Sequence, residues 1–73
     1  MKIYTSKRCL NCISLKQILL ENKIQFEEID GTTTKSVAYL RARKVSLQLP
    51  IIEENNEFFT YEQYINKYHE MLL

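Results

Sequence analysis

The sequence is poor in residues that interrupt regular structure. Among its 73 residues are one glycine, one proline, one histidine and no tryptophan. It has no low-complexity stretch, repeat or linker, so we expect a single domain over residues 1–73. Its apolar runs are all shorter than the roughly 20 residues of a membrane-spanning helix, so we expect no membrane as a partner.

The chain also lacks an excess of either charge. Ten Lys and Arg residues stand against nine Asp and Glu residues, which gives a net charge of +1 at pH 7. This balance provides no electrostatic reason to expect nucleic acid as a partner. The first five residues lack the apolar segment of a signal peptide, so we expect a cytoplasmic protein.

Only two cysteines are present, and they stand close together at positions 9 and 12. A disulfide stabilises a protein mainly by closing a loop in the unfolded chain, and so short a loop contributes only about 2 kcal/mol. Persistent disulfides are also rare in the cytosol. The Cys9-Leu10-Asn11-Cys12 spacing therefore indicates redox chemistry rather than a structural crosslink.

Apolar periodicity and turn residues predict seven elements in the order βαβαββα. The expected strands cover residues 2–5, 24–30, 51–53 and 57–59, and the expected helices cover residues 11–22, 36–43 and 61–72. Residues 31–34 offer an N-cap for the second helix. Thr60 followed by Gln63 predicts a capping box at the start of the third. This order is compatible with one four-stranded mixed sheet that is flanked by helices on both faces.

The cysteine pair is expected where the first helix begins, with Cys9 just before the helix and Cys12 in its first turn. Unpaired N–H groups and partial positive charge at a helix N-terminus favour a thiolate. Lys7 and Arg8 add a smaller positive contribution. We therefore expect the pKa of Cys9 to lie below that of a free thiol. Cys9 is assigned as the attacking thiol and the less exposed Cys12 as the resolving thiol.

The same two cysteines have a competing interpretation as metal ligands. A structural zinc site needs four ligands, and His69 is the only other good soft or imidazole ligand in the sequence. We therefore expect no metal site within one chain. Two alternatives stay open: a metal ion or cluster held between two subunits, and a non-catalytic interaction domain in which the dithiol is vestigial.

Two further groups of side chains allow more than one interpretation. The first consists of Tyr4, Tyr61, Tyr64 and Tyr68, and the second of Arg41, Arg43 and Lys44. The tyrosines stand at core-facing spacing, so we expect them to pack in the core, except Tyr61 near the dithiol. The cations are expected at a solvated helix end, with a docking patch for an acidic partner as the less favoured alternative. His69 is expected to be solvated.

These features together resemble the glutaredoxin branch of the thioredoxin-fold superfamily. The resemblance covers essentially the whole chain and rests on Ile3-Tyr4-Thr5, Cys9, Cys12, Ile29-Asp30-Gly31 and Pro50. Two segments, Gln48-Leu49-Pro50-Ile51-Ile52 and Ile65-Asn66-Lys67, are similar to those of NrdH-type redoxins. The resemblance implies an α/β protein with a minimal thioredoxin fold, whose mixed sheet has the strand order 2-1-3-4 and is flanked by three helices.

The resemblance also implies the activity and its residues. The implied protein is a monomeric dithiol–disulfide oxidoreductase that reduces protein disulfides without a bound cofactor, with ribonucleotide reductase as a family-level target. Cys9 and Cys12 carry the implied chemistry, and Pro50 is implied to be a cis proline beside them. Residues expected to contact a substrate or partner are Lys7, Arg8, Leu10, Asn11, Leu49, Thr60 and Tyr61.

The implied reductant is either thioredoxin reductase or glutathione. Glutaredoxins place a Gly-Gly pair and an acidic residue where glutathione binds, whereas this chain has Phe58-Phe59-Thr60-Tyr61-Glu62. Bulky side chains obstruct close approach to the backbone. The glutathione motif is therefore incomplete.

Overall fold

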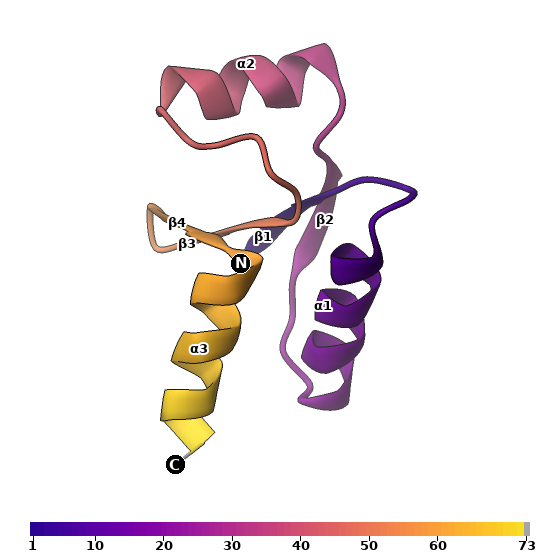
Figure 1. Cartoon of the computed structure of the whole chain (residues 1–73), viewed down its shortest axis with the longest axis vertical. Helices are drawn as coiled ribbons and strands as arrows, with labels where there is room; N and C mark the ends of the chain where they lie inside the picture. The colour runs from indigo at the N-terminus through magenta and orange to yellow at the C-terminus, as the bar shows by residue number, and fades with distance from the viewer. Residues whose placement is uncertain (73) are drawn as a thin grey trace.

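The computed structural model describes the backbone of residues 1–72 and the side chains of residues 1–67. The element order is βαβαββα (Figure 1), as the sequence predicts. The strands are β1 (Lys2–Thr5), β2 (Glu27–Asp30), β3 (Ile51–Glu54) and β4 (Glu57–Thr60). The helices are α1 (Leu10–Glu21), α2 (Thr34–Ala42) and α3 (Tyr61–Leu72).

The strands form one mixed sheet in the order β2-β1-β3-β4. β1 runs parallel to β2 and antiparallel to β3, and β3 pairs with β4 as an antiparallel hairpin. α1 and α3 lie on one side of the sheet and α2 lies on the other (Figure 1). This is the minimal thioredoxin fold, with the predicted order of elements and strands.

The core is divided by the sheet into two clusters. The cluster towards α1 and α3 contains Ile3, Leu15, Leu19, Ile52 and Tyr64, and the cluster towards α2 contains Tyr4, Leu40 and Ile51. Successive residues of a strand point to opposite faces, so neighbours in β1 and in β3 serve different clusters. The burial of Tyr4 and Tyr64 agrees with the predicted core packing. The side chains of Tyr68, His69 and Leu72 lie outside the described residues.

β2 is shorter than predicted, because it starts at Glu27 rather than at position 24. α1 ends in a turn in which Lys23 adopts a positive φ of 57°. The N–H of Ile24 donates to the Leu19 carbonyl at 2.9 Å, so this segment is still bonded to the helix. Ile24 and Phe26 pack against the first core cluster from a connection, and their alternation reflects burial rather than strand pairing.

The C-terminal end of α2 is fixed to the sheet by a polar cluster around Glu53. The hydroxyl groups of Tyr4 and Tyr39 donate to the Glu53 carboxylate at 2.7 and 2.9 Å. The Arg43 guanidinium lies 3.6 Å from the centre of the Tyr39 ring. Burial, together with the hydrogen bond to Glu53, raises the pKa of Tyr4 above its usual range. Arg43 is exposed at the end of α2, as expected, and it also stacks on an aromatic ring.

Residues 1–72 include no helix with both the length and the apolar character needed to cross a membrane.

Candidate active site

The cysteine pair lies at the start of α1, where the sequence predicts it. Cys9 is the N-cap residue, with extended backbone (φ −108°, ψ 109°), and its side chain accepts a hydrogen bond from the N–H of Cys12. The distance from that nitrogen to the Cys9 Sγ is 3.0 Å. The two cysteines form a disulfide, with their Cα atoms 5.1 Å apart. The cap sulfur therefore takes the place of the hydroxyl or carboxylate oxygen that usually satisfies this N–H.

The two cysteines differ in their exposure to solvent. Cys12 is 1% exposed, whereas Cys9 is only partly buried. Leu10 between them is 80% exposed, and Asn11 is exposed as well. The predicted difference between an accessible Cys9 and a sheltered Cys12 is thus confirmed.

The loop before β3 brings a second segment against the dithiol. The peptide bond between Leu49 and Pro50 is cis, as the family resemblance implies, and Pro50 is buried. The carbonyl oxygen of Leu49 lies 3.7 Å from the Cys9 Sγ. When Cys9 is reduced and protonated, this carbonyl is placed to accept a weak S–H hydrogen bond from it.

Gly31, at the end of β2, makes room for this loop. A Cβ at position 31 would lie 2.7 Å from Leu49 Cδ2 and 3.3 Å from Tyr4 Cβ. The backbone of Gly31 has no positive φ, so close approach rather than turn geometry favours glycine here. Gly31 supports the active-site loop without a place among the site residues predicted from the sequence. The sequence signal for this role was that Gly31 is the only glycine in the chain.

A hollow of about 380 Å³ lies beside Pro50. Its lining residues are Asn11, Gln48, Leu49, Pro50, Thr60, Tyr61 and Glu62. Asn11, Leu49, Thr60 and Tyr61 were each predicted to contact a substrate, and the fold brings them together from three separate segments. Gln48 and Glu62 were not predicted to take part. Both belong to segments on which the family comparison was made, residues 48–52 and 58–62, and that was the available signal.

The wall formed by Thr60 and Tyr61 is held by the predicted capping box. The Thr60 N–H donates to Gln63 Oε1 at 3.0 Å, and the Gln63 N–H donates to Thr60 Oγ1 at 3.1 Å. This reciprocal pair satisfies donors that a helix start would otherwise leave open. β4 therefore passes directly into α3, and Thr60 is fixed at the edge of the hollow.

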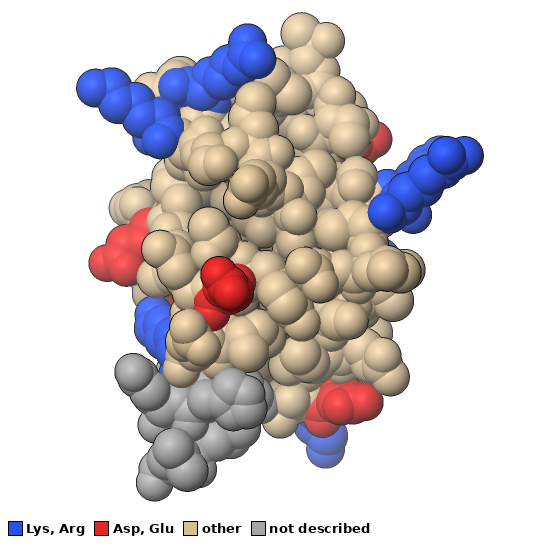
Figure 2. All heavy atoms as spheres, viewed as in Figure 1, with Lys and Arg blue, Asp and Glu red and all other residues tan. Residues whose placement is uncertain are grey.

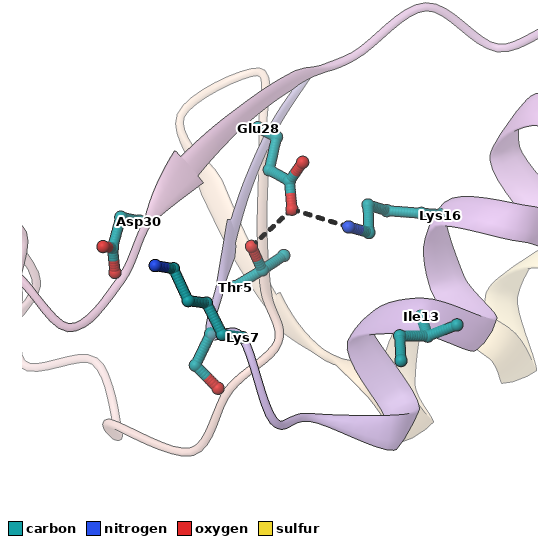
Figure 3. Close-up of a pocket in the computed structure, with 7 residues that line it drawn as sticks. Thr5, Lys7, Ile13, Lys16, Glu28 and Asp30 are labelled. Carbon is teal, nitrogen blue, oxygen red and sulfur yellow. Dashed lines mark hydrogen bonds and ion pairs between the residues drawn. The ribbon is translucent and has the colours of Figure 1, made fainter.

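Lys7, Arg8 and Leu10 do not line the hollow beside Pro50. Lys7 faces another part of the surface. It lines a second hollow, of about 470 Å³, on the β2 side of α1. In Figure 3 its ammonium points towards Asp30. Hydrogen bonds from the Thr32 hydroxyl and backbone N–H hold the pKa of Asp30 below its usual value, and the charge of Lys7 acts in the same direction. Arg8 is exposed.

Glu28 joins β1, β2 and α1 in the same hollow (Figure 3). Its Oε2 accepts a hydrogen bond from Thr5 Oγ1 at 2.7 Å and forms an ion pair with Lys16 Nζ at 2.9 Å. The Thr5 hydrogen bond, followed by the Lys16 interaction, lowers the pKa of Glu28. The charges of this hollow are thus largely engaged with one another.

The described residues contain no cluster of three or more His, Cys, Asp or Glu side chains that could hold a metal ion. The expectation about His69 lies outside the described side chains. A metal ion or cluster shared between two subunits therefore stays an untested alternative.

Comparison with known proteins gives no independent indication of activity. No protein-family model matches the sequence. No curated protein matches it either. Any assignment of function therefore depends on the residues and geometry of the cysteine pair and its surroundings.

Proposed function

We propose that this protein is a small dithiol–disulfide oxidoreductase that reduces protein disulfides through Cys9 and Cys12. The observation that carries the proposal is the placement of Cys9 at the N-cap of α1, accessible to solvent and bonded to the N–H of Cys12. The second sulfur, on Cys12, is sheltered and close enough to form a disulfide with the first. This is the arrangement that a two-step exchange requires.

The proposed reaction begins with the Cys9 thiolate. It attacks one sulfur of the substrate disulfide, and the other substrate sulfur leaves as a thiolate that takes a proton from water. Cys12 then loses its proton and attacks the Cys9 sulfur of the mixed disulfide, releasing the second substrate thiol. Two electrons have passed to the substrate, and the protein is left with its Cys9–Cys12 disulfide.

The helix start supports the thiolate that begins the reaction. The N–H of Cys12 donates directly to the sulfur, and the partial positive charge of the α1 N-terminus acts on the same atom. Both favour the anion, so we expect the pKa of Cys9 to lie below its ordinary value. Lys7 contributes less than its sequence position suggests, because its ammonium points towards Asp30 (Figure 3).

For the reductant we propose an enzyme of the thioredoxin reductase class rather than glutathione. Side chains of Thr60, Tyr61 and Glu62 line the hollow where glutaredoxins offer glycine backbone. The resemblance to NrdH-type redoxins, carried by residues 48–52, supports ribonucleotide reductase as the target. We further propose that the protein acts as a monomer in the cytoplasm and without a bound cofactor.

The proposal is tested by measuring two reactions, the reduction of a substrate disulfide by the protein and the reduction of the oxidised protein by its reductant. The reduced protein should reduce the disulfides of insulin, and the oxidised protein should be reduced by NADPH with thioredoxin reductase. Cys9→Ser should abolish turnover, whereas Cys12→Ser should stop after a stable mixed disulfide that mass spectrometry detects. Turnover by Cys9→Ser at the wild-type rate would contradict the activity. Fast turnover only with glutathione and its reductase would contradict the proposed reductant.

A further inference from the structure

The hollow beside Pro50 has a neighbour of about 360 Å³, which lies between the start of the loop 43–50 and the end of β4. Thr60 lines both hollows, and residues of the same loop and of the β4–α3 junction line each of them, so the two adjoin at Thr60. We call this pair of adjoining hollows the junction groove. It leads from Asn11 and Pro50 at the dithiol to Arg43 and Lys44 at the end of α2.

The two ends of the junction groove carry opposite charges. Glu62, in the first turn of α3, lines the dithiol end, and Arg43 and Lys44 line the α2 end. Figure 2 shows Lys and Arg side chains standing out at the upper left, over the C-terminal end of α2. A single acidic side chain stands over the start of α3, and the surface between the two places is uncharged (Figure 2).

The cations at the α2 end differ in how they are held. Arg43 is fixed on the Tyr39 ring, and its Nη1 donates to the Tyr39 carbonyl at 3.2 Å. Its charge is partly offset because the Glu53 carboxylate binds the hydroxyl of the same tyrosine. Lys44 is exposed and adopts a positive φ of 57°, just after the helix. Lys44 is therefore the cation whose removal changes the groove with least disturbance to the fold.

We infer that the junction groove holds an extended segment of the disulfide-bearing protein substrate, with acidic side chains at the α2 end and none beside the reactive cysteine. This inference rests on the proposed function, and it adds the class of substrate that the site accepts. A small thiol would occupy one hollow only, whereas an extended segment fills both. Lys44 and Leu49 are five positions apart, at most about 18 Å of extended chain. An acidic residue within about five positions of the substrate cysteine therefore reaches Lys44.

Synthetic peptides that carry one cysteine as a mixed disulfide with thionitrobenzoate provide the test. One peptide has two Asp residues about four positions from the cysteine, a length that matches the groove. It is made in two forms, with the acids before or after the cysteine. A second peptide has the same two Asp residues next to the cysteine, and a third has Asn instead. The reduced protein attacks the peptide sulfur and releases thionitrobenzoate, whose absorbance gives the rate. Each rate is divided by that with dithiothreitol, which removes the intrinsic reactivity of the peptide.

The wild-type protein should react about threefold to tenfold faster with one form of the distant-acid peptide than with the adjacent-acid peptide, and the Asn peptide should fall between them. Lys44→Gln should bring the distant-acid rate close to the Asn rate. Lys23→Gln is the matched control, because Lys23 is exposed and follows α1 with the same φ of 57°. Glu62→Gln should relieve the adjacent-acid penalty, and Glu57→Gln, on the hairpin, should not.

Each outcome decides between the inference and the proposed function. Equal normalised rates for all peptides would overturn the inference, as would a preference for the distant-acid peptide that survives Lys44→Gln. The proposed function would then still stand, because the Asn peptide would still be reduced. Release of thionitrobenzoate from every peptide no faster than with Cys9→Ser would instead show that the proposed function is wrong.

Discussion

A methyl group added to Gly31 would lie 2.7 Å from Cδ2 and 3.0 Å from Cδ1 of Leu49. The carbonyl of the same leucine is the backbone group 3.7 Å from the Cys9 sulfur. The end of β2 therefore sets the position of the cis-proline loop, and the loop in turn borders the dithiol. Leu49 therefore packs against Gly31 through its side chain and borders the Cys9 sulfur through its carbonyl.

Gly31→Ala should destabilise the protein by about 1–2 kcal/mol and slow disulfide reduction, because Leu49 must move out of the space that the methyl group takes. Both clashing atoms belong to the end of the Leu49 side chain, so Leu49→Ala removes them. In that background Gly31→Ala should cost less, and only the Tyr4 Cβ, at 3.3 Å, would still be crowded. Urea unfolding of the four proteins gives the coupling free energy. Equal costs in both backgrounds would show that Leu49 is not the obstacle.

The pKa of Cys9 should depend on the N–H of residue 12. In Cys12→Ser this donor is kept, and Cys9 should titrate below a free thiol. Cys12→Pro removes this donor at N3, where the N–H has no main-chain partner within the helix, so the pKa of Cys9 should rise relative to the serine variant. The pH dependence of alkylation by iodoacetamide reports both values, and circular dichroism checks that the helix is retained. The same pKa in both variants would assign the effect to the helix dipole alone.

Gln63→Ala should lower the free energy of unfolding by about 1 kcal/mol, because it leaves the N–H of Thr60 without its side-chain acceptor. Gln63→Glu keeps an acceptor at the same position, and its negative charge is favourable at a helix N-terminus. Urea denaturation should therefore place the glutamate variant close to wild type and the alanine variant below it. Identical stabilities for the alanine variant and the wild type would mean that solvent replaces the cap.

Glu28 should make the protein less stable in acid. Its pKa in the folded protein is lowered, chiefly by Thr5 and then by Lys16. The stabilisation is therefore complete above the ordinary pKa of a glutamate and is lost as the pH falls through the lowered value. Thr5→Val removes the main cause, so its stability should depend less on pH in this acidic range. Unfolding curves at a series of pH values between neutral and strongly acidic would measure the difference.

Much of the fold follows from local patterns that the sequence carries in full. The order of the elements, the two cysteines at the start of α1 and the Thr60–Gln63 capping box are each defined by residues within one or two turns of each other. Such local patterns predict the structure correctly because the interacting groups are close neighbours in the chain. The family resemblance added the cis peptide bond at Pro50 and the strand order, which no local pattern determines.

The features that the sequence did not reveal all depend on distant contacts. The alternation of Ile24 and Phe26 is typical of a strand, but pairing with β1 starts only at Glu27. Lys7 is next to the dithiol in sequence, whereas its ammonium points towards Asp30 (Figure 3). Leu49 packs against Gly31, although the two residues are 18 positions apart in the sequence (49 − 31). Each of these three features depends on how the strands and loops pack in three dimensions, which local sequence patterns do not specify.

The sulfur of Cys9 has two roles, because it caps α1 and exchanges electrons. An anionic sulfur accepts a stronger hydrogen bond from the Cys12 N–H than a neutral disulfide sulfur does. The first turn of α1 is therefore held more firmly in the reduced protein, and by a thermodynamic cycle the same free energy favours the uptake of electrons. A partner that unwinds this turn would lower the reduction potential of the Cys9–Cys12 couple. Distortion of one helical turn would therefore favour electron transfer from the protein to that partner.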